Sequence, residues 1–357
     1  MLATAIFVCS LSAVAIASHD LPMNPLAEKP DSGTLKRADE KDMRQVLKKL
    51  EQLGAKPIES RSVQEARAQP TPADAVKAVL ADMGKSPLTP AVKMQDMTYP
   101  IEGGTQPLRI YTPEGAGAEP LPIIVYYHGG GWVIADLNTY EASALALATK
   151  AKAIVVSVEY RHSPEAKFPA AHEDAFAGYK WILDNAAKLG GNPKKVAVVG
   201  ESAGGNLAIN VAIMARDKKV QQPVAMVLVY PVTQTNMDTP SYLDNQNAAP
   251  LSKAGMGWFV DHVLAKPEDA KNPMLNLTTE ADLKGLPSTT IIGAEIDPLR
   301  SDGTLLADKL EQAGVKVHYE LYSGVTHEFF GMDAVVAKAG EAQDFAAADL
   351  RRAFGLK

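Results

Sequence analysis

The sequence has one cysteine, Cys9, among its 357 residues. A single cysteine excludes a disulfide framework and a cysteine-based zinc site. Aromatic residues are scarce, at 6% of the chain, and basic residues form no blocks. With 36 Lys and Arg against 42 Asp and Glu, the formal net charge is −6. An acidic chain without a basic patch lacks the surface that binds nucleic-acid phosphates, so we expect no nucleic-acid partner.

The sequence also lacks a comfortable membrane span, since a helix needs about 20 apolar residues to cross a bilayer. The apolar run at 2–17 is shorter, carries no charge and ends in Ala15-Ile16-Ala17. This small-residue ending is typical of a signal-peptidase site, although no basic residue precedes the run. We therefore expect a signal peptide at 1–17 and a secreted or periplasmic protein. A buried N-terminal helix in a cytoplasmic protein is the alternative.

The segment after this run divides into a linker and two helical patterns. Residues 20–38 are polar and rich in Pro and Gly, which is typical of a linker. Apolar residues recur at helical spacing over 38–54, and a second helix is expected over 72–83. Each helix has one apolar face and is too small to form a core alone. We expect 18–93 to supply a linker and cap helices over the domain that follows.

From about residue 94, apolar strands alternate with helical segments. Strands are expected at 123–127, 153–158, 196–199, 224–230 and 289–292, and helices at 139–150, 170–189, 206–216 and 305–313. Continuously apolar strands are typical of a parallel sheet covered on both faces, so the alternation favours a doubly wound α/β fold. Residues 234–275 interrupt the alternation. We expect a catalytic domain at 94–357 whose insertion at 234–275 contributes to the cap.

A nucleophile motif occurs at Gly200-Glu201-Ser202-Ala203-Gly204, which has the pattern G-x-S-x-G. Three fixed residues carry little information alone, but this motif follows an expected strand and opens an expected helix. That context is typical of a nucleophile elbow, which exposes the serine hydroxyl at the start of a helix. The sequence therefore predicts Ser202 as a nucleophile. A capping serine in a glycine-rich turn is the alternative.

A glycine-rich loop, His128-Gly129-Gly130-Gly131-Trp132, follows the strand at 123–127. Its glycines leave backbone N–H groups open to a developing oxyanion. We expect Gly130, Gly131 and Ala203 to form an oxyanion hole, with His128 holding the loop. No second His, Cys or carboxylate stands near His128 at ligand spacing, and no Gly-Lys-Ser/Thr follows. We therefore expect no metal, no phosphate site and no cofactor.

A serine nucleophile needs a base, and the base needs an orienting carboxylate. In a fold with a nucleophile elbow, the chain order is Ser, acid, His. Three histidines follow Ser202: His318 alternates with charged residues on a strand, His262 lies in the insertion, and His327 stands in a loop after the last strand. Asp297 lies just beyond the strand at 289–292, where active sites of open α/β sheets collect. His327 and Asp297 are the predicted base and orienter; a surface histidine and a turn aspartate are the alternatives.

Together these motifs resemble the hormone-sensitive-lipase-like esterases, bacterial family IV, of the α/β-hydrolase fold. The matching residues are HGGGW at 128–132, YRHSPE at 160–165, FPAA at 168–171, GESAGGN at 200–206, DPL at 297–299 and His327. The resemblance covers about residues 38–355. It implies an eight-stranded, mostly parallel sheet with a helical cap, and a triad of Ser202, Asp297 and His327. Departures occur at Glu201, where Asp is common, at Ala135, and at His162-Ser163, where Leu-Ala is frequent; they bear on substrate preference.

The sequence thus predicts a carboxylic ester hydrolase that works through an acyl-enzyme on a small-molecule ester. A catalytically silent small-molecule receptor and an amidase are alternatives. We expect a preference for acyl chains of about two to eight carbons, because the charged cap helices leave little apolar surface for lipid. Candidate pocket residues, which could equally be packing residues, are Trp132, Tyr242, Trp258 and Phe259. The last strand, at 315–322, is a candidate sheet edge for a homodimer.

Overall fold

A computed structural model describes residues 37–38, 41–86, 90–115 and 119–356 of the chain. The expected signal peptide at 1–17 and almost all of the expected linker lie outside the described residues. Among the helices that are described, none is both long and apolar enough to cross a membrane.

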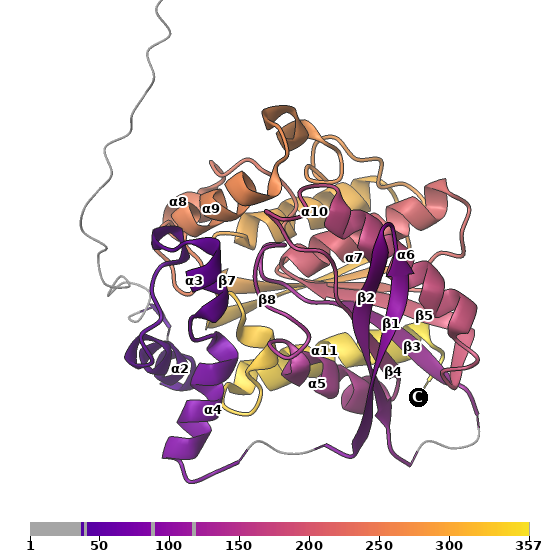
Figure 1. Cartoon of the computed structure of the whole chain (residues 1–357), viewed down its shortest axis with the longest axis horizontal. Helices are drawn as coiled ribbons and strands as arrows, with labels where there is room; N and C mark the ends of the chain where they lie inside the picture. The colour runs from indigo at the N-terminus through magenta and orange to yellow at the C-terminus, as the bar shows by residue number, and fades with distance from the viewer. Residues whose placement is uncertain (1–36, 39–40, 87–89, 116–118, 357) are drawn as a thin grey trace, which may run out of the picture.

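The fold is built on one eight-stranded sheet (Figure 1). Its strands are β1 (Val92–Ile101), β2 (Gly104–Pro113), β3 (Leu121–Tyr127), β4 (Ile154–Val158), β5 (Gly191–Glu201), β6 (Met226–Val229), β7 (Thr289–Ile296) and β8 (Val317–Thr326). They lie in the order β1-β2-β4-β3-β5-β6-β7-β8. The β1–β2 and β2–β4 pairs are antiparallel and all the others parallel. The predicted eight-stranded, mostly parallel α/β-hydrolase sheet is therefore confirmed.

Helices cover both faces of the sheet (Figure 1). One layer holds α5 (Glu141–Ala151) and α11 (Ala337–Ala353); the other holds α6 (Ala170–Asn185), α7 (Ala203–Asp217) and α10 (Arg300–Gln312). The residues of β3 alternate between the two layers, because successive side chains of a strand point to opposite faces. Val125 and Tyr127 join the core on the α6–α7 side, and Ile124 and Tyr126 join the other.

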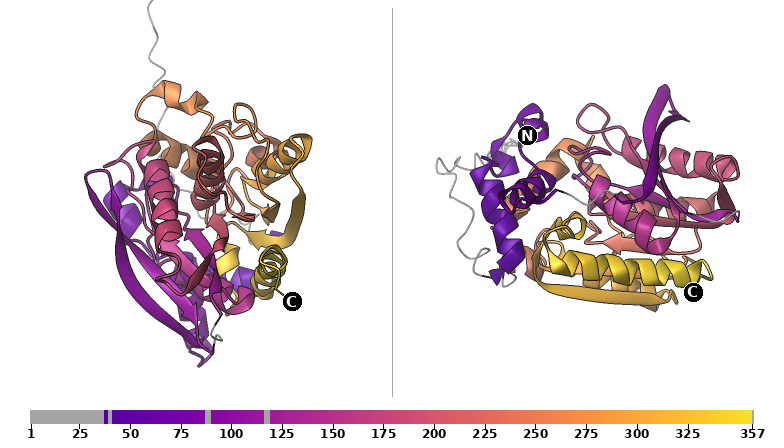
Figure 2. Two further views of the ribbon diagram at one scale, coloured as in Figure 1. Left: turned by 90° about the vertical axis from the view of Figure 1, so that its right-hand side faces the viewer. Right: turned by 90° about the horizontal axis from the view of Figure 1, so that it is seen from below.

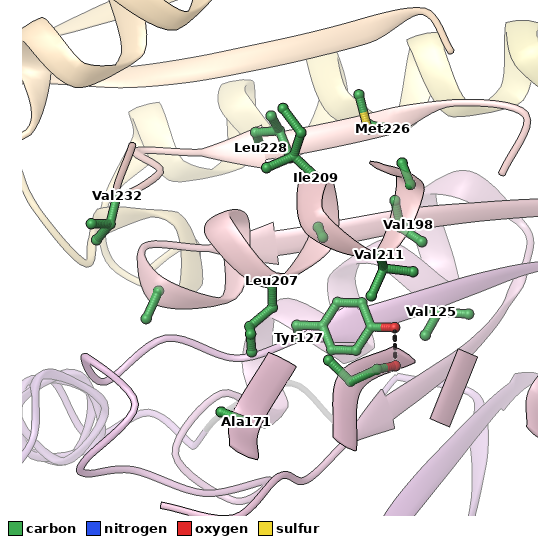
Figure 3. Close-up of a cluster of buried hydrophobic side chains, with 14 of the residues drawn as sticks. Val125, Tyr127, Ala171, Val198, Leu207, Ile209, Val211, Met226, Leu228 and Val232 are labelled. Carbon is green, nitrogen blue, oxygen red and sulfur yellow. Dashed lines mark hydrogen bonds between the residues drawn. The ribbon is translucent and has the colours of Figure 1, made fainter. Parts of the chain in front are cut away.

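Figure 3 shows part of the core on the α6–α7 side, which includes Leu207 and Val211 of α7 and Val198 of β5. Each such fully buried aliphatic side chain contributes roughly 1.5–3 kcal/mol to folding. Tyr127 is also fully buried, and its hydroxyl donates a hydrogen bond to the Ala175 carbonyl oxygen at 3.0 Å. The apolar strands therefore form a rigid support for the loops at their carboxyl ends.

The N-terminal helices lie at one end of the molecule (Figure 2, right). They are α2 (Lys41–Gln52), α3 (Val63–Ala68) and α4 (Pro72–Asp82), with the short helix η1 (Ile58–Ser60) after α2. Arg67 of α3 fixes this end to the domain: it donates to the carbonyl oxygens of Val133 and Ser163 and makes a bidentate ion pair with Glu165. These partners follow β3 and β4, so the N-terminal helices lie at the carboxyl end of the sheet.

The insertion between β6 and β7 lies against the same N-terminal segment. It contains α8 (Pro240–Asp244), α9 (Lys253–Val263) and η2 (Pro267–Lys271). The Trp258 indole N–H donates to the Arg61 carbonyl oxygen at 3.1 Å, and the Ser252 hydroxyl donates to Glu59 at 3.2 Å. These contacts are consistent with a cap built from both segments. The boundary at residue 94 between the cap segment and the catalytic domain stays a prediction.

Candidate active site

Ser202 stands in a sharp turn between β5 and α7. Its backbone has φ 56° and ψ −118°, a conformation that an L-residue rarely adopts. The turn depends on its glycines: a side chain on Gly200 would collide with the Gly204 backbone, and one on Gly204 with the Tyr127 carbonyl. The strained turn places Ser202 at the start of α7, as the sequence motif predicts, but the side chain is buried rather than exposed.

The structure brings Ser202, His327 and Asp297 together in one chain of hydrogen bonds. The His327 Nε2 atom lies 2.9 Å from the Ser202 Oγ atom, and Nδ1 lies 2.7 Å from Asp297 Oδ2. The other carboxylate oxygen of Asp297 accepts from the Leu299 backbone N–H at 2.8 Å. Because a carboxylate only accepts, the His327 proton belongs on Nδ1, and Nε2 is free to accept the serine proton.

Burial and charge act against each other at His327. Burial has the largest single effect and lowers the pKa, but Asp297, together with Glu328 and Glu201, outweighs it, so the pKa of His327 lies above its ordinary value. Glu328 adds a second, weaker contribution, with one oxygen 3.8 Å from Nε2. That oxygen accepts a 2.6 Å hydrogen bond from the Tyr140 hydroxyl. The site therefore favours the imidazolium that forms when the base takes a proton.

Glu201, which stands where the esterase family named above commonly has Asp, lies next to Ser202 in the chain. Its carboxyl group is buried and accepts hydrogen bonds of 2.5 Å from the hydroxyls of Tyr126 and Tyr230. Burial raises the pKa of Glu201 to about 7. The Tyr230 ring lies against His327, with ring centres 4.4 Å apart. Glu201 thus fixes the Tyr230 ring, which packs on His327. No spacing pattern in the sequence signals this contact, so sequence patterns could not predict it.

The glycine-rich loop lies beside Ser202. Gly130 and Gly131 have φ of 91° and 58°, and the Gly130 carbonyl accepts from the N–H groups of Val133 and Ile134 at 3.0 Å each. A side chain on Gly131 would collide with the Phe259 ring. Within the described chain, the Gly130 and Gly131 N–H groups donate to no backbone carbonyl. Ala203 is the first residue of α7, where a helix leaves its N–H groups unpaired.

The other two histidines after Ser202, and a second buried aspartate, Asp302, have separate partners. His318 is partly exposed and pairs with Asp349 at 2.8 Å, while His262 Nδ1 lies 2.7 Å from the Trp258 carbonyl oxygen. Asp302 is fully buried, and burial raises its pKa to about 7. Its carboxylate accepts from the Thr233 backbone N–H at 2.9 Å and from the Gln234 side chain at 3.2 Å. Asp302 therefore fixes a turn after β6.

The four candidate pocket residues differ in their surroundings. Phe259 lies against the glycine-rich loop at Gly131. Trp132 lines a small hollow between this loop and the insertion, together with Val232, Gln234, Thr235, Val260, Val263, Leu264 and Leu275. Trp258 is partly buried and packs on His262, with ring centres 4.1 Å apart. Tyr242 is fully buried in the core, which favours packing over a pocket role.

His128 does not stand alone, contrary to the expectation from spacing. Its Nε2 atom lies 2.9 Å from Glu159 Oε1, and the Nε2 atom of His162 lies 3.1 Å from the same oxygen. The expectation that no ligand cluster exists here is wrong, because β3 and β4 are adjacent parallel strands with Tyr127 opposite Val158. Residues 128 and 159 directly follow that pair. A search of consecutive strand ends could have found this cluster.

Comparison with known proteins gives matches over most of the chain. A family described as having the alpha/beta hydrolase fold matches residues 124–331. The carboxylesterase NlhH of Mycobacterium tuberculosis is 38% identical over 295 residues, which are 79% of this chain and 91% of that protein. An ethyl acetate hydrolase of Pseudomonas putida is 34% identical, covering 67% of this chain and 76% of that protein. The solved structure of a Pyrobaculum calidifontis esterase aligns with TM-score 0.76 and 36% identity, covering 85% of this chain and 97% of that one.

Proposed function

This chain belongs to the α/β-hydrolase-fold family, and we propose that it is a carboxylesterase with Ser202 as nucleophile, His327 as base and Asp297 as orienter. The observation that carries the proposal is the continuous set of hydrogen bonds from the Ser202 hydroxyl through His327 to the buried Asp297. Such a relay is what ester cleavage by a serine needs: a base that takes the proton and a carboxylate that stabilises the resulting imidazolium.

The first half of the reaction forms an acyl-enzyme. His327 Nε2 takes the proton of Ser202 as Oγ attacks the ester carbonyl carbon, and the carbonyl oxygen becomes an oxyanion. The N–H groups of Gly130, Gly131 and Ala203 are the proposed donors to that oxygen, each worth roughly 3–4 kcal/mol. When the tetrahedral intermediate collapses, His327 returns the proton to the leaving alcohol. The acyl group stays on Ser202.

The second half of the reaction releases the acid. Water enters beside His327, which takes its proton while the water oxygen attacks the acyl carbon. The same N–H groups bind the second oxyanion, and on collapse His327 returns the proton to the Ser202 oxygen, which frees the serine and the carboxylic acid. Asp297 keeps the His327 ring in the tautomer that serves both halves, because its carboxylate holds the Nδ1 proton.

We propose a preference for acyl chains of about two to eight carbons, since each methylene contributes roughly 0.8 kcal/mol only where a pocket receives it. The Phe259 ring against Gly131 and the small hollow at Trp132 support a short acyl site. The similarity to an ethyl acetate hydrolase supports a small ester. The test is kcat/KM for p-nitrophenyl esters from acetate to palmitate, with emulsified triolein. A maximum at twelve carbons or more, or faster hydrolysis at the lipid surface, would contradict the proposal.

The same assay separates the alternative functions. A silent receptor would bind the esters without turnover, and an amidase would cleave the matched p-nitroanilide at a comparable rate. We expect clear ester hydrolysis and a far slower anilide reaction, because an amine leaving group demands more acid catalysis.

Two further proposals concern the whole protein. We propose export after cleavage following Ala17, supported by the apolar run at 2–17; mass spectrometry of the N-terminus of protein from the extracellular or periplasmic fraction tests it. We also propose a homodimer through β8, which is the last strand in the sheet order. Light scattering of the purified protein tests the dimer, and a monomer at micromolar concentration would contradict it.

A further inference from the structure

Three side chains meet at the carboxyl ends of β3 and β4, outside the proposed triad. The Nε2 atoms of His128 and His162 and a carboxylate oxygen of Glu159 all lie within 4.8 Å of one another. His128 is fully buried, whereas the side chains of Glu159 and His162 are 12% and 19% exposed. The cluster is thus enclosed on the His128 side, and the His162 ring reaches solvent on the other side although its Nε2 atom is buried.

The hydrogen bonds of His128 decide which ring nitrogen is free. Nδ1 lies 2.9 Å from the Gly129 carbonyl oxygen, which can only accept, so Nδ1 carries the proton. In the neutral ring, Nε2 then presents a lone pair to the Glu159 oxygen 2.9 Å away. Two acceptors do not lie this close with nothing between them. Either a second proton or a metal ion must bridge His128 and Glu159.

His162 provides an independent sign. Its Nε2 atom is buried and lies 3.1 Å from Glu159 Oε1, yet it makes no well-formed hydrogen bond with the described residues. A buried ring nitrogen without a hydrogen bond carries a desolvation penalty of about 1–3 kcal/mol. A metal ion placed between the three donor atoms would give this nitrogen a partner.

We propose that His128, Glu159 and His162 form a zinc-binding site, with both Nε2 atoms and Glu159 Oε1 as ligands and water in the fourth position. Two imidazoles and one carboxylate are a common zinc set with an open position. Imidazole ligands also disfavour Mg²⁺ and Ca²⁺, which take oxygen ligands. Tetrahedral donors at zinc distances of about 2.0–2.1 Å are about 3.3 Å apart. The distances of 2.9 and 3.1 Å from Glu159 Oε1 to the two nitrogens require outward shifts of a few tenths of an ångström, and all three donor atoms lie within 4.8 Å of one another.

The surroundings of His128 suit a metal ligand. The other ring nitrogen of a ligating histidine usually donates to a carbonyl or carboxylate, as Nδ1 does here to Gly129. The Tyr160 ring stacks on His128, and its hydroxyl lies 2.9 Å from the His128 carbonyl oxygen and 3.0 Å from that of Gly129. The site therefore adjoins the start of the oxyanion loop. Zinc would fix the His128 ring there without taking part in acyl transfer.

The test is a zinc titration of the full-length, tag-free protein after dialysis against a chelator, with a chromophoric chelator as competitor. We expect one zinc per chain, and at least about tenfold weaker binding in His162→Leu. His318→Gln is the matched control, since it removes a histidine paired with a single carboxylate, Asp349. We expect it to bind zinc like the wild type. Mg²⁺ should not compete.

Three outcomes would overturn the proposal: folded wild type that binds no zinc, which leaves a proton as the bridge; equal binding by His162→Leu; or loss of binding in His318→Gln. Circular dichroism melts of each variant show that it is folded. Ser202→Ala, tested in parallel, should bind zinc normally whether or not the chain is an esterase. The failure of the zinc site and the failure of the proposed function are therefore distinguishable.

Discussion

Two buried histidines of this molecule each lie against a carboxylate of their own. The two clusters differ in the third group, which is a hydroxyl in one and a second imidazole in the other. His327 lies between Asp297 and the Ser202 hydroxyl, with distances of 2.7 and 2.9 Å. His128 lies 2.9 Å from Glu159, whose same oxygen faces His162 at 3.1 Å. Both carboxylates raise the pKa of their histidine against the effect of burial. Burial and charge alone therefore do not distinguish the two clusters.

The third partner sets the chemistry available to each. A hydroxyl can give up its proton to the imidazole and become a nucleophile, so the first cluster can form a covalent intermediate. A second imidazole offers a lone pair or another proton and has no hydroxyl to give up, so the second cluster is suited to holding a cation. We therefore propose catalysis for the first histidine–carboxylate pair and metal binding for the second.

Removing the serine hydroxyl is the most direct test of the difference between the two clusters. Ser202→Ala removes the hydroxyl that distinguishes the first cluster, and we expect kcat for p-nitrophenyl acetate to fall by at least about 10³-fold. Ser157→Ala is the matched control: this serine is also buried, and its hydroxyl has no hydrogen-bond partner within the described chain. Retention of activity within about tenfold in Ser202→Ala would exclude it as the nucleophile.

The carboxylates provide the next test. Asp297 and Asp302 are both fully buried, yet only Asp297 contacts His327. We expect Asp297→Asn to lower kcat by about 10³–10⁴-fold, because an amide permits the wrong His327 tautomer. Asp302→Asn should mainly lower stability, by about 1–3 kcal/mol, because its amide nitrogen can face the donors Thr233 and Gln234. Kinetics and thermal melts of both variants check this; a larger kinetic loss in Asp302→Asn would contradict the assignment.

Sequence patterns predicted the first cluster and missed the second. Ser202 and Asp297 follow apolar strands and His327 follows the alternating last strand, and strand ends of a parallel sheet converge at one edge. The short helix α3 was missed because six residues are too few for a periodic pattern, although the Ser62–Glu65 capping box signals its start. The Glu159–His162 approach to His128 depends on β4 lying next to β3 in register, which apolar runs alone do not specify.

The pH dependence of hydrolysis sharpens the comparison further. Burial lowers the pKa of His327, but Asp297, Glu328 and Glu201 together raise it above its ordinary value of about 6.5. The base works only when neutral, so the rate should fall about tenfold per pH unit below a midpoint above 6.5. Tyr230, which packs on His327, stays protonated over this range because burial raises its pKa. A rate independent of pH between about 5 and 8 would contradict a His327 base.

The smallest expected effect comes from removing metal. Every group in the proposed acyl transfer is supplied by the chain, from the Ser202 hydroxyl to the N–H donors of the glycine-rich loop. Tyr160 holds the start of that loop through the carbonyls of His128 and Gly129. We therefore expect EDTA to leave kcat/KM within about twofold of its initial value, even where a zinc assay shows that the metal has left. Dialysis into metal-free buffer without chelator is the control. Strong inhibition by EDTA that zinc reverses would contradict this expectation. It would mean that the glycine-rich loop depends on the metal for its geometry, so that the two clusters act as one catalytic unit.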